Sequence, residues 1–164
     1  MKKYIPHILG AIFVLVIIGA WMLIAHLVKK PSETQVPFVA AHNYFLRNDV
    51  TAPVPAKIGS QCEFEQYFGM AALMGKNGQP TPIDFETLFA IAVVLPETNH
   101  STELHAESLT DDGKKLIFSY HVDVAPKENT WIQVPMLLIF VNRQYERDQV
   151  ELHSDFMTDI VRIQ

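Results

Sequence analysis

The first part of the chain carries one uninterrupted apolar stretch, whereas the rest alternates short apolar and polar segments. Residues 8–28, ILGAIFVLVIIGAWMLIAHLV, contain no formal charge and have two lysines on each side. At a rise of about 1.5 Å per residue, a helix of this length covers roughly 30 Å, the thickness of the hydrocarbon core of a bilayer. The pattern therefore predicts a transmembrane anchor over residues 1–30, and a cleaved signal peptide is the alternative interpretation.

Beyond this stretch, polar residues 31–37 indicate a linker, and the apolar segments that follow are short enough for β-strands. The strand-like segments are, in chain order, 40–48, 88–95, 131–134, 136–142 and 149–156. The segment 88–95 is apolar without alternation, which is typical of a central strand covered on both faces. Pro135 separates two of the segments and requires an edge or a bulge there.

One helix is predicted in the part of the chain after the linker. Ser60 and Glu63 match a capping box, in which the two side chains satisfy the first backbone N–H groups of a helix. Apolar residues then recur at spacings of three and four up to Met74, and Gly75 follows as a C-terminal cap. The spacing predicts a helix over residues 61–74 with one apolar face.

Asp111, Asp112 and Gly113 lie between two strand-like segments, 102–110 and 114–125, and predict a β-hairpin. We expect Gly113 in the left-handed position of a three-residue loop, since a two-residue loop would mix polar and apolar side chains on each face. This register places Leu104, Ala106, Ser108, Leu116, Phe118, Tyr120 and Val122 on one face, and Glu103, His105, Glu107, Ser119, His121 and Asp123 on the other.

Together these elements predict an α+β fold class, with one N-terminal transmembrane helix plus a mostly antiparallel β-sheet domain and one packed α-helix. The predicted organisation is an anchor over 1–30, a linker over 31–37 and an extracytoplasmic α+β domain over 38–164. Lysines and the amino terminus before the apolar stretch favour a cytoplasmic N-terminus. The expected location is the cytoplasmic membrane, spanned once through residues 8–28.

The net charge limits the classes of partner that this chain can bind, and its cysteine content limits its disulfides. Of thirteen Lys and Arg residues, four flank the apolar stretch, and the remaining nine stand against eighteen Asp and Glu, a net charge of about −9. Nucleic acids and anionic lipids are poor partners for such a surface. The single cysteine, Cys62, cannot form an internal disulfide. No sequence motif indicates a cofactor, so none is expected.

The polar face of the predicted hairpin holds the strongest candidate for metal chemistry. Glu103, His105, His121 and Asp123 share that face, and cross-strand neighbours are close enough to bind one ion. A solvated polar sheet face explains the same residues. A metal-dependent or hydrolytic enzyme using His105, His121 and the nearby carboxylates is therefore the alternative function, and the preferred interpretation is a protein without catalytic activity.

The charged segment 142–149, NRQYERDQ, is the preferred candidate for a binding surface. It is expected to be an exposed loop that presents Arg143, Tyr145 and Arg147. Tyrosine and arginine are enriched among the residues that dominate protein–protein binding energies. The loop therefore predicts a contact with a protein partner.

The segment 83–152 resembles the C-terminal domain of bacterial protease-stability (PrcB-type) proteins. The matching features are Ile83-Asp84-Phe85 before an apolar strand, a charged hairpin, and Val134-Pro135 before a second apolar strand. The glycine–aromatic element of that family is replaced here by residues 96–100. The resemblance implies a non-catalytic, membrane-anchored envelope protein that binds or stabilises another envelope protein, such as a protease. A purely structural envelope component is the remaining alternative.

Overall fold

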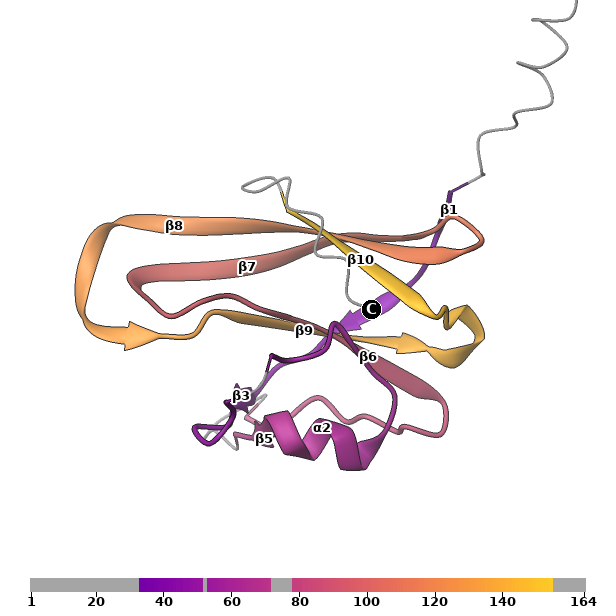
Figure 1. Ribbon diagram of the computed structural model, residues 1–164, viewed down its shortest axis with the longest axis horizontal. Coiled ribbons are helices and arrows are strands. Elements are labelled where there is room, and N and C mark those ends of the chain that lie inside the picture. Colours follow the sequence, from indigo (N-terminus) through magenta and orange to yellow (C-terminus); the bar gives the residue numbers. More distant parts are fainter. Residues whose placement is uncertain (1–32, 52, 72–77, 155–164) are drawn as a thin grey trace, which may run out of the picture. The chain divides into compact units, whose positions relative to one another are not determined.

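Most of the residues that the structure describes are in β-strands. The computed structural model of the chain describes residues 33–51, 53–71 and 78–154 (Figure 1). Strands make up 57% of these residues, and their α-helix is the seven-residue α2, Gln61–Tyr67. The predicted α+β class is therefore wrong, because the helix is too short to form a layer of its own, and the fold is mostly β.

The transmembrane helix in the predicted fold class is not part of the fold described. None of the helices within the described ranges is long and apolar enough to cross a membrane. The apolar stretch 8–28, from which the anchor was predicted, lies outside the described residues.

The helix α2 begins as the capping box predicts. Ser60 is the N-cap, and its hydroxyl accepts a hydrogen bond from the Glu63 backbone N–H at 3.3 Å. The Glu63 carboxylate in turn accepts a hydrogen bond from the Gly59 backbone N–H at 3.1 Å. Both groups therefore satisfy backbone donors at the start of the helix, as expected of this motif. Gly75, the predicted C-terminal cap, lies outside the described residues.

The end of α2 differs from the prediction, because the helix stops at Tyr67 instead of residue 74. The chain continues as strand β5, Phe68–Met70, which pairs antiparallel with β3, Tyr44–Leu46. Gly69 lies against the Phe45 ring, and a Cβ atom at this glycine would lie 2.4 Å from Phe45 Cζ. Pairing with a distant strand thus overrides the helical spacing of the apolar residues.

Eight of the strands form two four-stranded sheets. Sheet A has the order β1 (Thr34–Gln35), β7 (Thr98–Asp111), β8 (Lys115–Gln133) and β10 (Gln149–Ser154). Sheet B has the order β2 (Phe38–Ala40), β9 (Met136–Asn142), β6 (Leu88–Val94) and β4 (Lys57–Ile58). Neighbouring strands are antiparallel except for β10, which pairs parallel with β8. The prediction of a mostly antiparallel sheet agrees with these pairings.

Sheet B is the central layer, with sheet A on one face and α2 with the β3–β5 ribbon on the other (Figure 1). In β6, Phe89, Ile91 and Val93 pack toward sheet A, whereas Ala90 and Ala92 pack toward α2 and the β3–β5 ribbon. A strand buried on both faces needs apolar residues at consecutive positions. The central strand predicted over 88–95 is therefore confirmed.

Near its middle the β7–β8 hairpin has the predicted distribution of side chains over its two faces, but its pairs differ from those of a three-residue loop over 111–113, which would place Leu104 opposite Tyr120. Leu104 is opposite Val122, His105 is opposite His121, and Gly113 has a positive φ of 87°. A register shift between Ala106 and Ser108 then changes the pairing closer to the turn. As a result Leu109 packs in the core in place of Ser108, the residue predicted to share the apolar face.

Residues 34–36, which were predicted to be part of a linker, pair with β7, and Val36 packs in the core. Thr34–Gln35, within the predicted linker, pairs with the end of β7. Val36 is 1% exposed, and its N–H donates to the Leu109 carbonyl at 2.8 Å. The strand predicted over 40–48 is divided into β2 and β3 at Asn43, which has a φ of 62° and turns the chain out of sheet B.

Candidate functional site

The three predicted binding residues lie in or directly after the 3-10 helix η1, Arg143–Tyr145, between β9 and β10. The Arg143 guanidinium donates from Nε to the Phe85 carbonyl at 3.0 Å and from Nη1 to the Glu146 carboxylate at 2.7 Å. Its Nη2 donates to the Gly59 carbonyl. Arg143 therefore joins segments that are far apart in the sequence and stabilises their arrangement.

The other two predicted binding residues also contact the body of the fold. The Arg147 guanidinium forms a two-point pair with the buried Asp111 carboxylate, with Nε–Oδ1 at 3.1 Å and Nη2–Oδ2 at 2.5 Å. Tyr145 is half-buried and packs against the core between the sheets. The structure thus places Arg143, Tyr145 and Arg147 in one loop. The two guanidinium groups form hydrogen bonds within the chain, and Tyr145 packs against the core.

The structure does bring together the four residues of the predicted metal site on the outer face of the hairpin. His105 Nε2 lies 3.3 Å from Asp123 Oδ2 and 3.8 Å from Glu103 Oε2, and His121 Nε2 lies 3.2 Å from Asp123 Oδ1. The side chains are between 43% and 74% exposed, so water screens their interactions. Both imidazoles therefore lie next to the Asp123 carboxylate.

These four side chains form one connected polar cluster on the exposed face of sheet A. Across the described ranges, no group of three or more His, Cys, Asp or Glu side chains is arranged to hold a metal ion. Cys62 lies in the first turn of α2 as a free, exposed thiol.

A groove, which the sequence did not indicate, lies between the β3–β5 ribbon and the segment where β8 passes into β9. It is here called the apolar groove after Phe45 of the ribbon and Ile132, Val134 and Met136 of the other wall. Polar residues complete its lining, namely Arg47, Asn48, Glu97 and Gln133, and its volume is about 600 Å³. This volume is in the range of pockets that bind ligands or side chains of a partner. Phe45 is 47% exposed and Ile132 is 69% exposed. Both large side chains are therefore accessible to a partner.

Hydrogen bonds hold both walls of this groove in place. On one wall, the Tyr44 hydroxyl donates to the Thr81 carbonyl at 2.6 Å, and burial raises the pKa of Tyr44 above its ordinary value. On the other, Gln133 Nε2 donates to the carbonyls of His100 and Thr102, both at 3.1 Å. The backbone on each side of the groove is thus tied to a neighbouring segment.

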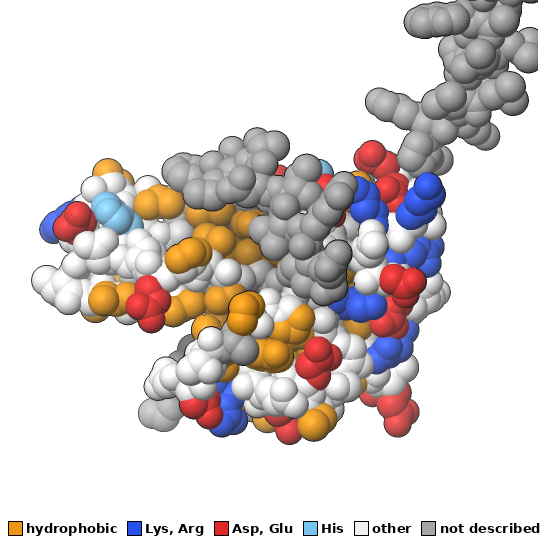
Figure 2. Space-filling view, in the orientation of Figure 1, with side chains coloured by type: hydrophobic (Ala, Val, Ile, Leu, Met, Phe, Trp, Pro, Cys, Tyr) orange, Lys and Arg blue, Asp and Glu red, His pale blue; other side chains and the backbone are white. Residues whose placement is uncertain are grey.

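Charged side chains are unevenly spread over the visible face. They gather at the end that carries β1 and the turn of the β7–β8 hairpin (Figure 2). Fewer charges and more apolar and uncharged polar side chains appear toward the opposite end, where β8 ends (Figure 2). The apolar groove lies at this less charged end, since Ile132, one of its lining residues, is near the end of β8.

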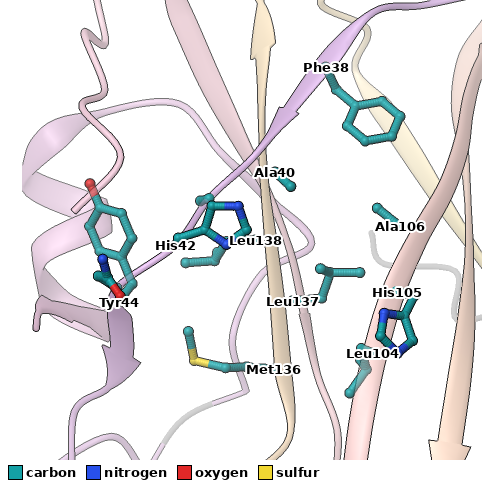
Figure 3. Close-up of a pocket in the computed structure, with 12 residues that line it drawn as sticks. Phe38, Ala40, His42, Tyr44, Leu104, His105, Ala106, Met136, Leu137 and Leu138 are labelled. Atoms are coloured by element: carbon teal, nitrogen blue, oxygen red, sulfur yellow. The ribbon is translucent and has the colours of Figure 1, made fainter. Parts of the chain in front are cut away.

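A second groove, here called the edge groove, opens between the two sheets and has a volume of about 470 Å³. Phe38 and Ala40 of β2, Leu104 and Ala106 of β7, and Leu137 of β9 line it. Figure 3 shows the side chains of β7 on one side of the groove and those of residues 42 and 44 on the other. The edge groove lies beside β7, which the outer strand β1 pairs only at Thr110 and Asp111.

Comparisons with known proteins give no relative for this chain: no family model, no curated protein and no solved structure matches it. The resemblance to protease-stability proteins therefore stays a prediction.

Sequence reasoning missed both grooves because each is lined by segments far apart in the chain. Phe45 and Ile132 meet in one groove although more than eighty residues lie between them. The sequence contains one weak indication of the wall that is formed where β8 passes into β9. Trp131 and Ile132 are large apolar residues next to a segment interrupted by a proline. Their exposure could not be deduced, because the same residues would fit a buried strand equally well.

Proposed function

We propose that this chain is a protein-binding domain, and that a partner protein inserts an apolar side chain between Phe45 and Ile132. The observation that carries the proposal is the exposure of these two residues, 47% and 69%, across one apolar groove. Apolar surface left in water is unfavourable, and a partner that covers it recovers that free energy. The groove therefore supplies a driving force for association.

The surroundings of the groove have the composition of a protein interface. Arg47 and Glu97 lie at the groove, and Arg47 pairs with Asp49 at 2.9 Å on the exposed surface. Tyr44 and Phe45 supply aromatic rings to the lining of the groove. An apolar centre with aromatic residues and a charged rim is typical of surfaces that bind proteins.

The resemblance implies the class of partner, namely a protease or another protein of the cell envelope. The apolar groove supports binding of a protein in general, because apolar contact does not depend on the partner's activity. Identification of the captured partner would distinguish a protease from other proteins.

Site-specific photo-crosslinking tests the proposal. A photoreactive amino acid is placed at position 132 of the full-length chain in its host cells, and a matched probe replaces the exposed Glu86, which is not among the residues lining the groove. We expect a discrete protein adduct from position 132 that position 86 does not give. Phe45→Ser should abolish this adduct, because it removes the opposite wall of the groove.

Unfolding measurements on serine variants at positions 132 and 45 provide the control. Because Ile132 is mostly exposed, Ile132→Ser should change the free energy of unfolding by no more than about 0.5 kcal/mol. Circular dichroism of Phe45→Ser establishes that this variant is folded. Identical adducts from positions 132 and 86, or an adduct that survives Phe45→Ser in a folded chain, would refute the proposed function.

A further inference from the structure

Between Glu103 and Ser108, strand β7 has a partner strand among the described residues along only one of its two edges, whereas the carbonyls of His100 and Thr102 accept hydrogen bonds from Gln133 Nε2. Strand β8 pairs with one edge from Thr98 to Asp111. On the other edge, β1 pairs with Thr110 and Asp111, and the Leu109 carbonyl accepts from the Val36 N–H at 2.8 Å. Before Leu109, no strand among the described residues pairs with this edge. An open strand edge offers backbone donors and acceptors to an added strand.

The edge groove lies directly beside this open edge of β7. Leu104 and Ala106 point from β7 into the groove, and Phe38 and Leu137 line it from sheet B (Figure 3). The groove stays open because β2 ends at Ala40 and the chain then turns away from sheet B. A strand added to β7 would therefore place alternate side chains over the apolar residues of the edge groove.

The outward face of the same edge carries negative charge. Glu103 and Glu107 are exposed on this face, on either side of His105, whereas Leu104 and Ala106 are at least partly buried on the inner face. A strand beside β7 would set a side chain next to the Glu103 carboxylate, and the Glu107 carboxylate lies at the register shift that follows Ala106. Lysine or arginine at such a position would be attracted, and acidic residues would be repelled.

The same charges argue against a second copy of this chain as the occupant. Pairing two β7 edges would bring Glu103 and Glu107 of one copy close to those of the other. The chain also has a net charge of −5, so two copies repel each other at longer range. Acidic residues on an edge strand oppose self-pairing in natural sheets.

We infer that the open edge of β7 binds an extended segment of a partner protein in which apolar residues alternate with lysine or arginine. The added strand hydrogen-bonds to the β7 backbone, its apolar residues enter the edge groove, and its basic residues face Glu103 and Glu107. This inference rests on the proposed function, because it names the kind of partner segment. It uses a different surface from the Phe45–Ile132 contact, so the two can fail separately.

A synthetic peptide provides the test. The probe is a fluorescent peptide of about eight residues in which valine alternates with lysine, and its binding to the full-length chain is followed by fluorescence anisotropy. One control peptide has the same composition in scrambled order, and another carries N-methyl groups on alternate backbone amides. We expect the alternating peptide to bind at least tenfold more tightly than either control, because only it combines the side-chain pattern with free backbone donors.

Charge reversal on the protein supplies the second arm of the test. Glu103→Lys with Glu107→Lys should weaken binding of the valine–lysine peptide about tenfold and strengthen binding of a valine–glutamate peptide. The matched control is Glu86→Lys with Asp148→Lys, which changes the net charge equally at exposed positions outside the edge groove. This control should retain most of the binding.

Three outcomes would overturn the inference. The first is equal affinity for the alternating and scrambled peptides, and the second is equal weakening by the two charge-reversed variants, which would indicate unspecific attraction. The third is concentration-dependent dimerisation of the chain that Glu103→Lys with Glu107→Lys alters, together with no peptide binding. Phe45→Ser should leave peptide binding unchanged, so loss of the crosslink in that variant and loss of the peptide in the edge variant report on different surfaces.

Discussion

Removing the Arg147 guanidinium should destabilise the domain, because it leaves the buried Asp111 carboxylate with too few donors. This carboxylate is 10% exposed and accepts hydrogen bonds from Arg147 at 3.1 and 2.5 Å and from the Gly113 N–H at 2.8 Å. In Arg147→Ala only the backbone bond remains among these. Breaking a fully buried ion pair costs roughly 3–5 kcal/mol.

The cost at Arg147 should be smaller, because its side chain is 33% exposed and water screens part of the interaction. We therefore expect a loss of about 2 kcal/mol in the free energy of unfolding. For a domain of this size, such a loss corresponds to a decrease in Tm of roughly 8 °C. Urea unfolding followed by circular dichroism measures the free energy, and a double-mutant cycle with Asp111→Asn isolates the pair.

The matched control is the exposed pair Arg47–Asp49, which has the same two-point geometry, with contacts of 3.0 and 2.9 Å. Arg47→Ala should cost much less, because both side chains are well exposed to water. Equal losses in Arg147→Ala and Arg47→Ala would refute the reasoning, since burial would then not be the cause. Additive effects of Arg147→Ala and Asp111→Asn would refute it as well.

Three further changes test the fold and its response to acid. Phe140→Ala should cost about 3–5 kcal/mol by urea unfolding, because Phe140 is 2% exposed in the central layer. Ser60→Ala should cost about 1 kcal/mol in the same assay, because it removes the acceptor for the Glu63 N–H. The hydrogen bond from Lys115 lowers the pKa of Glu151, so this carboxylate stabilises the fold above its unfolded pKa and loses that contribution as the pH falls. Glu151→Gln should therefore lose less stability than the unmodified chain between about pH 5 and pH 3, and parallel pH profiles would contradict this assignment.

The candidate surfaces were predictable only where one hairpin contains all the relevant residues. The alternation of the hairpin placed His105 and His121 on one polar face in advance, and the structure brings these residues together with Glu103 and Asp123 on that face. The grooves were not predictable, because a groove depends on the gap between elements, and the sequence pattern of one element contains no information on that gap.

The segment around Arg147 shows why charged residues in a loop are ambiguous. From the sequence, its arginine and tyrosine residues are equally compatible with partner binding and with bracing of the fold. The structure places the Asp111 carboxylate within hydrogen-bonding distance of Arg147, although the two residues are far apart in the chain. A buried carboxylate requires donors, and this requirement becomes visible only once burial is known.

The sequence by itself determined the local features of this protein. Ser60 and Glu63 specify the start of α2, the apolar run of β6 specifies a strand covered on both faces, and Gly113 specifies the hairpin turn. Each depends on residues within a few positions of one another, so neighbouring side chains and backbone dihedral angles are sufficient to establish it.

The tertiary structure alone decided where α2 ends, which strands meet and which surfaces stay open. Phe68–Met70 becomes a strand because β3 is available to pair with it, despite the helical spacing of its apolar residues. The edge of β7 remains open because the partner strand β1 is short and the chain turns away at Asn43, after β2 has ended. Such outcomes depend on contacts between distant segments, whose free energy exceeds local conformational preferences.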